Sequence, residues 1–129
     1  PTARAFLTGA LRDVSTLDAK DIRRGMPRFY PEHYAANLKL LDGYARIAQD
    51  AGCSMAQLSL AWVLSRGEHV IALPGTTSLA HLEENLGADA VTLSAGTLQQ
   101  LDALINRHTV SGARYNAATQ AEVDTEEFG

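Results

Sequence analysis

The chain contains, at residues 73–85, the stretch Leu73-Pro74-Gly75-Thr76-Thr77-Ser78-Leu79-Ala80-His81-Leu82-Glu83-Glu84-Asn85. The apolar run Val70-Ile71-Ala72-Leu73 leads into it, and the run's short length and β-branched start favour a strand buried on both faces, as in parallel sheets. Ser78 is a residue type that caps helices, and leucines follow it at helical spacing. We therefore predict one short strand at about 70–73, a Pro-Gly turn, and a helix over 79–87.

Helical patterns lie on both sides of this stretch. Residues 32–51 carry one apolar stripe at helical spacing, and Gly52 stands where a glycine commonly ends a helix. Ser54-Met55-Ala56-Gln57 matches a capping box that opens a second helix, closed by Gly67. This helix is apolar almost all round, which is typical of a helix buried on more than one side. A further helix is predicted over 95–107.

The two ends of the chain show weaker patterns. Residues 1–31 are irregular, with a short helical turn expected at about 17–22, and a long loop of this kind is usually functional or disordered. The segment from His108 onward is polar, and we expect residues 116–129 to form a partly disordered tail.

The predicted strand has no predicted partner. The pattern gives at least four helices but a single strand, and one strand alone cannot satisfy its own backbone N–H and C=O groups. Either residues 70–73 pair with something outside this sequence, or the strand prediction is wrong.

The composition is that of an ordinary globular protein. The chain has 129 residues, of which 46% are hydrophobic and 20% charged, and its net charge is −4. This length supports one domain with a modest core. The acidic balance argues against a nucleic-acid partner or an anionic membrane surface, because both favour a basic face. No apolar run approaches the ~20 residues that a membrane-spanning helix needs.

Cysteine and histidine usage point away from disulfides and metals. The single Cys53 cannot form an internal disulfide, and the start of the chain lacks the apolar segment of a signal peptide, so we expect a cytoplasmic location and a structural thiol. His33, His69 and His108 show no metal-ligand spacing, so no metal site is predicted.

Several blocks of the chain resemble, in the same order, the C-terminal part of aldo-keto reductases. Pro1–Gly9 is similar to the family stretch S-P-L-x-R-G-F-L-T-G, and Gly25–Phe29 resembles a later "PRF" block of one branch. Ala56–Leu64 is similar to the family's "AQLALAWVL" helix. Val70–Asn85 resembles its last strand, loop and helix, and Gly112-Ala113-Arg114-Tyr115 its closing G-x-R-Y.

The resemblance implies a (β/α)8 TIM barrel, an α/β fold with its active site at the C-terminal face of the strands. This chain would be the C-terminal fragment from just after the seventh strand, with residues 1–115 in the barrel fragment and 116–129 as the tail. By itself it would be mostly α-helical with one short strand. The family's catalytic Asp, Tyr, Lys and His lie in the earlier half of the barrel, so no residue here receives a catalytic role. The parent would reduce aldehydes or ketones to alcohols with NADP(H), and the isolated chain would be inactive.

The same resemblance implies that this chain grips the adenine end of the cofactor. Gly75 lets the backbone come close to the nucleotide, and Thr77 offers a hydroxyl and an N–H where the family binds the 2′-phosphate of NADP. His81 would pair with that phosphate as a cation. Glu84 and Asn85 suit the amino group and ring edge of adenine. The resemblance implies two further contacts to the cofactor. The loop with Thr2, Ala3, Arg4 and Ala5 would lie over the pyrophosphate, and an arginine of the long loop, Arg23 or Arg24, would approach the adenine or the phosphates.

The sequence departs from the family pattern at several of these positions. Thr2 stands where Leu is usual, and Ala3 and Ala5 fill positions that are often Gly. Thr76 and His81 stand where many members have Lys and Arg. We favour NADP(H) as the cofactor, with NAD(H) as the alternative, and an isolated chain that holds neither is also compatible with the pattern.

A second hypothesis needs no cofactor. Taken alone, Ser78–Glu84 is an ordinary capped helix with acidic residues near its start. Four helices and one unpaired strand would also suit a non-catalytic helical module that covers its apolar faces with a second copy or a protein partner. Under the first hypothesis, the partner is the missing N-terminal half of the barrel. A second copy that pairs the 70–73 strands would fall between the two hypotheses.

Overall fold

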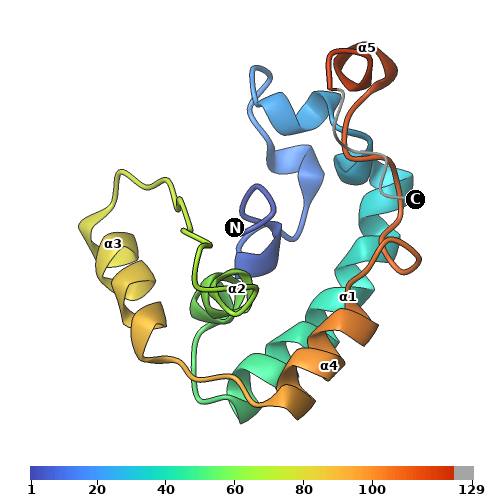
Figure 1. Cartoon of the computed structure of the whole chain (residues 1–129). Helices are drawn as coiled ribbons and strands as arrows, with labels where there is room; N and C mark the ends of the chain where they lie inside the picture. The colour runs from blue at the N-terminus through green and yellow to red at the C-terminus, as the bar shows by residue number, and fades with distance from the viewer. Residues whose placement is uncertain (124–129) are drawn as a thin grey trace.

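The computed structural model describes residues 1–123, and these are mostly helical. The α-helices, labelled in Figure 1, are α1 (Pro31–Asp50), α2 (Met55–Leu64), α3 (Leu79–Leu86), α4 (Ala95–Leu104) and α5 (Ala117–Gln120). Short 3-10 turns join them: η1 (Phe6–Thr8), η2 (Val14–Thr16), η3 (Ile22–Gly25), η4 (Pro27–Phe29) and η5 (Gly87–Ala90). The four longest helices confirm the four helices predicted from the sequence.

Local signals in the sequence explain where these helices begin and end. α1 starts at Pro31. Proline has no backbone N–H, and this costs nothing here because an N–H in the first helical turn has no partner within the helix. After the end of α1, Gly52 has a φ of +68°, a left-handed conformation that favours glycine. The predicted capping box at α2 is present: the Gln57 N–H donates to the Ser54 hydroxyl, and the Ser54 N–H donates to the Gln57 side chain, both at 3.1 Å.

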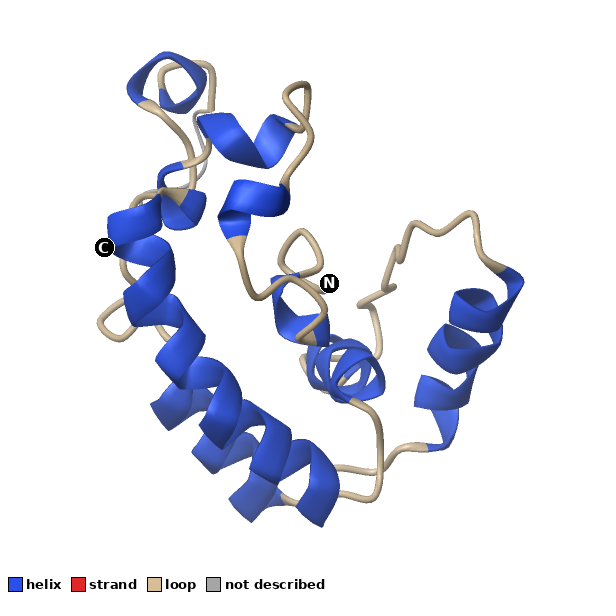
Figure 2. Cartoon of the chain, turned by 180° about the vertical axis from the view of Figure 1, so that it is seen from behind, coloured by secondary structure: helices blue, strands red, loops and turns tan. Residues whose placement is uncertain are grey.

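The helices form an open arrangement around α2 (Figures 1 and 2). α1 and α4 lie side by side along one limb, and α3 forms the opposite limb. α2 lies between them and contacts α1, α3, η1 and η5, which confirms that this apolar helix is buried on more than one side. The N-terminal segment rests on α2, so residues 1–8 lie between the two limbs.

One small core joins α1, α2, α4 and η1. Its fully buried side chains include Leu41 and Tyr44 of α1, Leu58 of α2 and Leu101 of α4. The Tyr44 hydroxyl donates to the Met55 carbonyl at 3.1 Å, so burying this ring leaves no polar atom unpaired. Cys53 and Trp62 pack at the edge of this core rather than inside it. Burial raises the pKa of the Cys53 thiol, as expected for a structural cysteine.

The predicted strand at 70–73 is wrong for this chain. Within residues 1–123 no segment forms a strand, and Val70–Leu73 runs as a loop, with Ile71 81% exposed and Leu73 84% exposed. A strand needs a neighbouring strand to take its N–H and C=O groups, and the described residues supply none. The apolar face of α3 is exposed as well, at Leu79, Leu82 and Leu86. Large apolar side chains are therefore uncovered both in the 70–73 loop and on α3.

The ends of the chain are more ordered than the sequence indicated. The expected turn near 17–22 lies between η2 and η3, where the Asp21 N–H donates to the Asp18 carbonyl at 3.0 Å. Asn116 caps α5 through its side chain, so part of the predicted polar tail is helical. The rest of that tail prediction falls on residues 124–129, which lie outside the described residues. No helix in residues 1–123 has the length and apolar character needed to cross a bilayer.

Candidate functional site

Two hollows meet at the N-terminal turn and the loop that follows residue 73. The larger has a volume of about 710 Å³ and the smaller about 430 Å³, and both are bordered by Pro1, Thr2, Ala5 and Gly75. A Cβ placed on Gly75 would meet no atom within 4 Å, so the space beside this backbone is free for a ligand.

The smaller hollow gathers much of the predicted adenine grip. His81, Glu84 and Asn85 of α3 line one side, beside Pro74, Gly75 and Thr76, and the turn carrying Thr2 and Ala5 lines the other. The side chain of Gln57 in α2 donates to the Glu84 carbonyl at 3.0 Å, which fixes α3 against α2. Ser78 caps α3 by accepting from the His81 N–H. Polar side chains and a helix start thus surround one face of this space.

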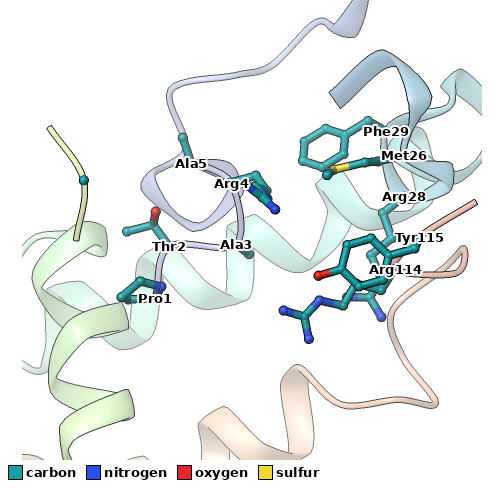
Figure 3. A pocket seen from close by; sticks show the side chains of 11 residues that line it. Pro1, Thr2, Ala3, Arg4, Ala5, Met26, Arg28, Phe29, Arg114 and Tyr115 are labelled. Carbon is teal, nitrogen blue, oxygen red and sulfur yellow. The ribbon is translucent and has the colours of Figure 1, made fainter. Parts of the chain in front are cut away.

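The larger hollow is lined by cationic and aromatic side chains. Figure 3 shows Arg4 on one side, and Arg28, Arg114 and Tyr115 on the other. Among the described residues that line it, none is acidic. The Arg114 guanidinium lies 5.2 Å from the centroid of the Tyr115 ring, a cation–π contact. The predicted Ala3 and Arg4 belong to this hollow.

Residues 3–5 form a strained turn between the two hollows. Ala3, Arg4 and Ala5 have φ values of 51°, 58° and 67°, in the left-handed region that L residues rarely adopt. The Leu7 N–H closes the turn by donating to the Thr2 carbonyl at 3.1 Å, and the buried Ser59 hydroxyl anchors it by donating to the Pro1 carbonyl at 2.6 Å. Within the described residues, no acceptor takes the N–H groups of residues 3–5. Successive free N–H groups of this kind suit an anion.

The strain leads to a stability prediction at Ala5. Replacing Ala5 by glycine should raise the free energy of unfolding by about 0.5–1 kcal/mol, because the roughly 1–2 kcal/mol left-handed penalty disappears while the unfolded chain gains some freedom. The matched control is Ala36→Gly at an exposed position inside α1, which should lower stability by about 1 kcal/mol. Urea denaturation measures the free energy of unfolding of both variants. A loss of stability in both would contradict the claim that the backbone is strained at Ala5.

Three of the predicted site residues lie away from the hollows. Arg23 forms two hydrogen bonds to Asp21, at 2.9 and 2.7 Å, and this pairing lowers the pKa of Asp21 to about 2. Another nitrogen of Arg23 lies 3.4 Å from the Arg4 carbonyl, so Arg23 supports the strained turn. Arg24 donates to the Leu17 carbonyl at 3.0 Å. Neither these arginines nor Thr77 is among the residues that line the two hollows.

In the larger hollow, the sequence analysis missed five of the residues that line it: Met26, Arg28, Phe29, Arg114 and Tyr115. Their signal was present, since they fall in the "PRF" and G-x-R-Y blocks, but they are far apart in sequence. Asn37, which is only 3% exposed, connects the two segments that carry these residues. Its side chain bonds to the backbone of Ser111 and of Arg28, which no local pattern in the sequence indicates.

Within residues 1–123, no three His, Cys, Asp or Glu side chains converge in a way that could hold a metal ion. The chemistry of the two hollows is instead that of polar side chains, backbone N–H groups and arginines around an open space. Such a set defines a candidate site for an anionic, nucleotide-like ligand.

Comparison with known proteins agrees with this class. The family model described as "Aldo/keto reductase family" matches residues 1–106, so the chain belongs to the aldo/keto reductase family. Membership implies a (β/α)8-barrel parent fold. The chain is 37% identical to aldo-keto reductase yakc [NADP(+)] of Schizosaccharomyces pombe, over 97% of this chain and 37% of that protein.

Two further relatives match most of this chain and about a third of their own length. Probable aldo-keto reductase 1 of Glycine max is 34% identical over 89% of this chain and 33% of its own length. Aldo-keto reductase str7 of Strobilurus tenacellus is 28% identical over 88% of this chain and 34% of its own length. The chain therefore spans about a third of the length of the curated relatives that it matches.

Proposed function

We propose that this chain is the C-terminal, cofactor-gripping part of an NADP(H)-dependent aldo-keto reductase that reduces aldehydes or ketones to alcohols. The observation that carries the proposal is the pair of hollows around Gly75, in a chain of this family whose fission-yeast relative is an NADP(+) protein. The nicotinamide cofactor would supply the hydride. In this proposal, the residues that act on the carbonyl group belong to the part of the barrel outside this chain, and the chain alone is inactive.

The smaller hollow suits the adenine end of the cofactor. Glu84 and Asn85 present a carboxylate and an amide beside an open space, which suits the donor and acceptor pattern of adenine. His81 and Thr76 border the same space near the start of α3, where backbone N–H groups and the imidazole side chain can donate to the 2′-phosphate. The strained turn at residues 3–5 would then receive the pyrophosphate. Thr77, which does not line the hollow, stays a weaker candidate.

The uncovered apolar limb supports the part of the proposal that concerns the missing barrel. Ile71 and Leu73 alternate with Val70 and Ala72, and both are more than four-fifths exposed. Exposed apolar surface of this extent usually marks a surface that another chain or segment covers. We propose that the remaining barrel strands cover it. The second candidate function, a helical module that pairs with a second copy, rests on the same surface and predicts a stable dimer in light scattering.

A titration of the isolated chain with NADPH tests the cofactor grip. We expect weak binding, with a Kd of about 1 mM, because much of the cofactor would lie against the rest of the barrel. Asn85→Ala should weaken binding several-fold, since it removes a side chain that borders the adenine space. The matched control is Gln100→Ala, which removes an exposed amide from α4, away from both hollows. Equal affinities of the two variants, or no binding by the parent chain, would contradict the proposal.

A further inference from the structure

One wall of the smaller hollow is held only lightly by packing. α3 carries His81, Glu84 and Asn85 to the hollow, but none of its own side chains is buried. Its apolar face is exposed, and the loop that precedes it carries the exposed Ile71 and Leu73. α3 has 8 residues, and isolated helices shorter than about 12–15 residues are marginal in water. The position of α3 therefore depends on how its C-terminal end is attached to the rest of the chain.

The C-terminal end of α3 is attached to α2 by the Gln57 side chain. The Gln57 amide donates to the Glu84 carbonyl at 3.0 Å. This carbonyl is one of the last in α3, and such carbonyls lack a partner within their own helix. Within the part of the chain that the structure describes, no other hydrogen bond joins α3 to α2 or to the N-terminal turn. Gln57 is therefore the polar link that fixes α3 against α2.

The capping box of α2 holds the same side chain in place. The Gln57 side-chain oxygen accepts from the Ser54 N–H at 3.1 Å, while its nitrogen is left to donate to α3. A primary amide has both an acceptor oxygen and a donor nitrogen, so one side chain caps α2 and holds α3 at the same time. Ser54, Met55 and Ala56 at this start of α2 border the smaller hollow. The link to α3 thus begins next to the residues that form the α2 side of this space.

The residue that follows α3 has no room for a side chain. A Cβ placed on Gly87 would lie 2.6 Å from the Gln57 amide nitrogen, which is closer than a Cβ comes to other atoms in proteins. The Gly87 backbone is right-handed helical, with φ −61° and ψ −16°, so alanine suits the conformation and only the contact with Gln57 opposes it. The next residue, Ala88, is buried. The absence of a side chain at Gly87 therefore lets the end of α3 lie against Gln57.

The opposite wall of the hollow is attached to the same helix in a different way. Ser59 of α2 is buried, and its hydroxyl donates to the Pro1 carbonyl at 2.6 Å. Leu7, just after the strained turn, is part of the core. The turn thus has an apolar anchor as well as a hydrogen bond, whereas α3 buries no side chain of its own. A change at Gln57 should therefore displace α3 and leave the turn in place.

We propose that Gln57 is a positioning residue for the smaller hollow. It sets the position of α3, and with it the positions of the side chains that α3 brings to this space. Gly87 provides the room that this position requires. The role of Gln57 in cofactor binding rests on the proposed function, whereas the attachment of α3 through Gln57 does not.

The test is an isosteric change, Gln57→Glu, in the isolated 129-residue chain at neutral pH. A carboxylate keeps an oxygen that accepts from the Ser54 N–H and suits the start of α2, but it has no N–H for the Glu84 carbonyl. We expect the amides of residues 82–86 to exchange with deuterium at least about tenfold faster, because the carbonyl loses its partner and faces a negative charge. NADPH should bind about threefold more weakly or worse. The amides of α1 and α4 should keep the parent rates.

The matched control for this change is Gln100→Glu. It adds the same charge at an exposed position of α4 that borders neither hollow. It should leave both the exchange rates of α3 and the NADPH affinity at the parent values. A difference between the two variants therefore reports the lost link and not the added charge of the chain as a whole.

Gly87→Ala tests the same link without any charge. The new methyl group should displace the Gln57 amide from the Glu84 carbonyl, speed exchange in α3 and weaken NADPH binding, although alanine itself favours a helix. In a Gln57→Ala background, Gly87→Ala should have no further effect, because the amide that it displaces is absent. The matched control is Gly96→Ala in α4, where a Cβ would meet only the Ser94 hydroxyl, at 3.7 Å.

Equal exchange rates of α3 in the Gln57→Glu and Gln100→Glu variants would overturn the proposal. An effect of Gly87→Ala that persists in the Gln57→Ala background would also overturn it, and so would faster exchange with an unchanged NADPH affinity. Failure of the parent chain to bind NADPH would contradict the proposed function and, with it, the role of Gln57 in cofactor binding. The exchange rates would then still decide whether Gln57 positions α3.

Discussion

The isolated chain should show no NADPH-dependent reduction of an aldehyde, whereas a chimera in which this chain replaces the matched 37% of the Schizosaccharomyces pombe relative should turn over substrate on the order of once per second or faster. The physical reason is that, under the proposed function, this chain would contact the cofactor's adenine half but would supply no group that protonates the carbonyl oxygen. The change from no detectable rate to an ordinary enzymatic rate is the largest effect that we expect.

The chimera also tests the cofactor grip under working conditions. In the chimera, Asn85→Ala should raise the KM for NADPH while leaving kcat nearly unchanged, because adenine contacts are the same in the ground state and the transition state. Gln100→Ala should change neither constant. Robust turnover by the isolated chain would contradict the claim that the missing part of the barrel is essential.

Replacing Leu41 by alanine should lower the free energy of unfolding of the isolated chain by about 2–5 kcal/mol, since Leu41 is fully buried in the core between α1, α2, α4 and η1. A domain of this size is stable by only about 5–15 kcal/mol, so this one substitution would remove a large share of the total stability. Urea denaturation followed by circular dichroism measures the change.

The matched control for Leu41→Ala is Leu73→Ala, which removes the same atoms from a side chain that is 84% exposed. In the isolated chain this change should stay within about 0.5 kcal/mol of the parent. In the chimera it should cost about 2 kcal/mol or more, because the restored strands would bury Leu73. A neutral effect of Leu73→Ala in both proteins would contradict the proposal that the apolar limb is covered by the rest of the barrel.

The helices were predictable because their signals are local. The apolar stripe before Gly52 and the capping box at Ser54 each depend on residues within a few positions, so the sequence shows them directly. Their ends differ from the predictions by a few residues where the last turn is replaced by a 3-10 turn or a loop, as at η5 after α3.

The strand was not predictable in the same way, because it depends on a partner. Val70–Leu73 has the composition of a buried strand, but a strand exists only where a neighbouring chain segment accepts its hydrogen bonds. The sequence pattern indicates a segment suited to a buried position between two neighbouring strands. Ile71 and Leu73 are exposed, so the described residues do not provide such a position.

The candidate site was predictable only in part, for a related reason. Residues of the 75–85 stretch come together because they share one loop and one helix. Arg28 and Arg114 come together only through the buried Asn37, and single-sequence patterns contain no information on such long-range side-chain contacts. The left-handed turn at Ala3–Ala5 was also missed, although glycine preferences in the family at two of these positions are a signal for it.

The most direct test of the cofactor grip is an NMR titration of the isolated chain with NADP+, read residue by residue. The proposed function predicts amide shift changes at Gly75, Glu84 and Asn85 and in the turn at residues 3–5, with the amides of α4 unchanged. Changes confined to α4 or to the exposed face of α3, or no changes at millimolar NADP+, would contradict it.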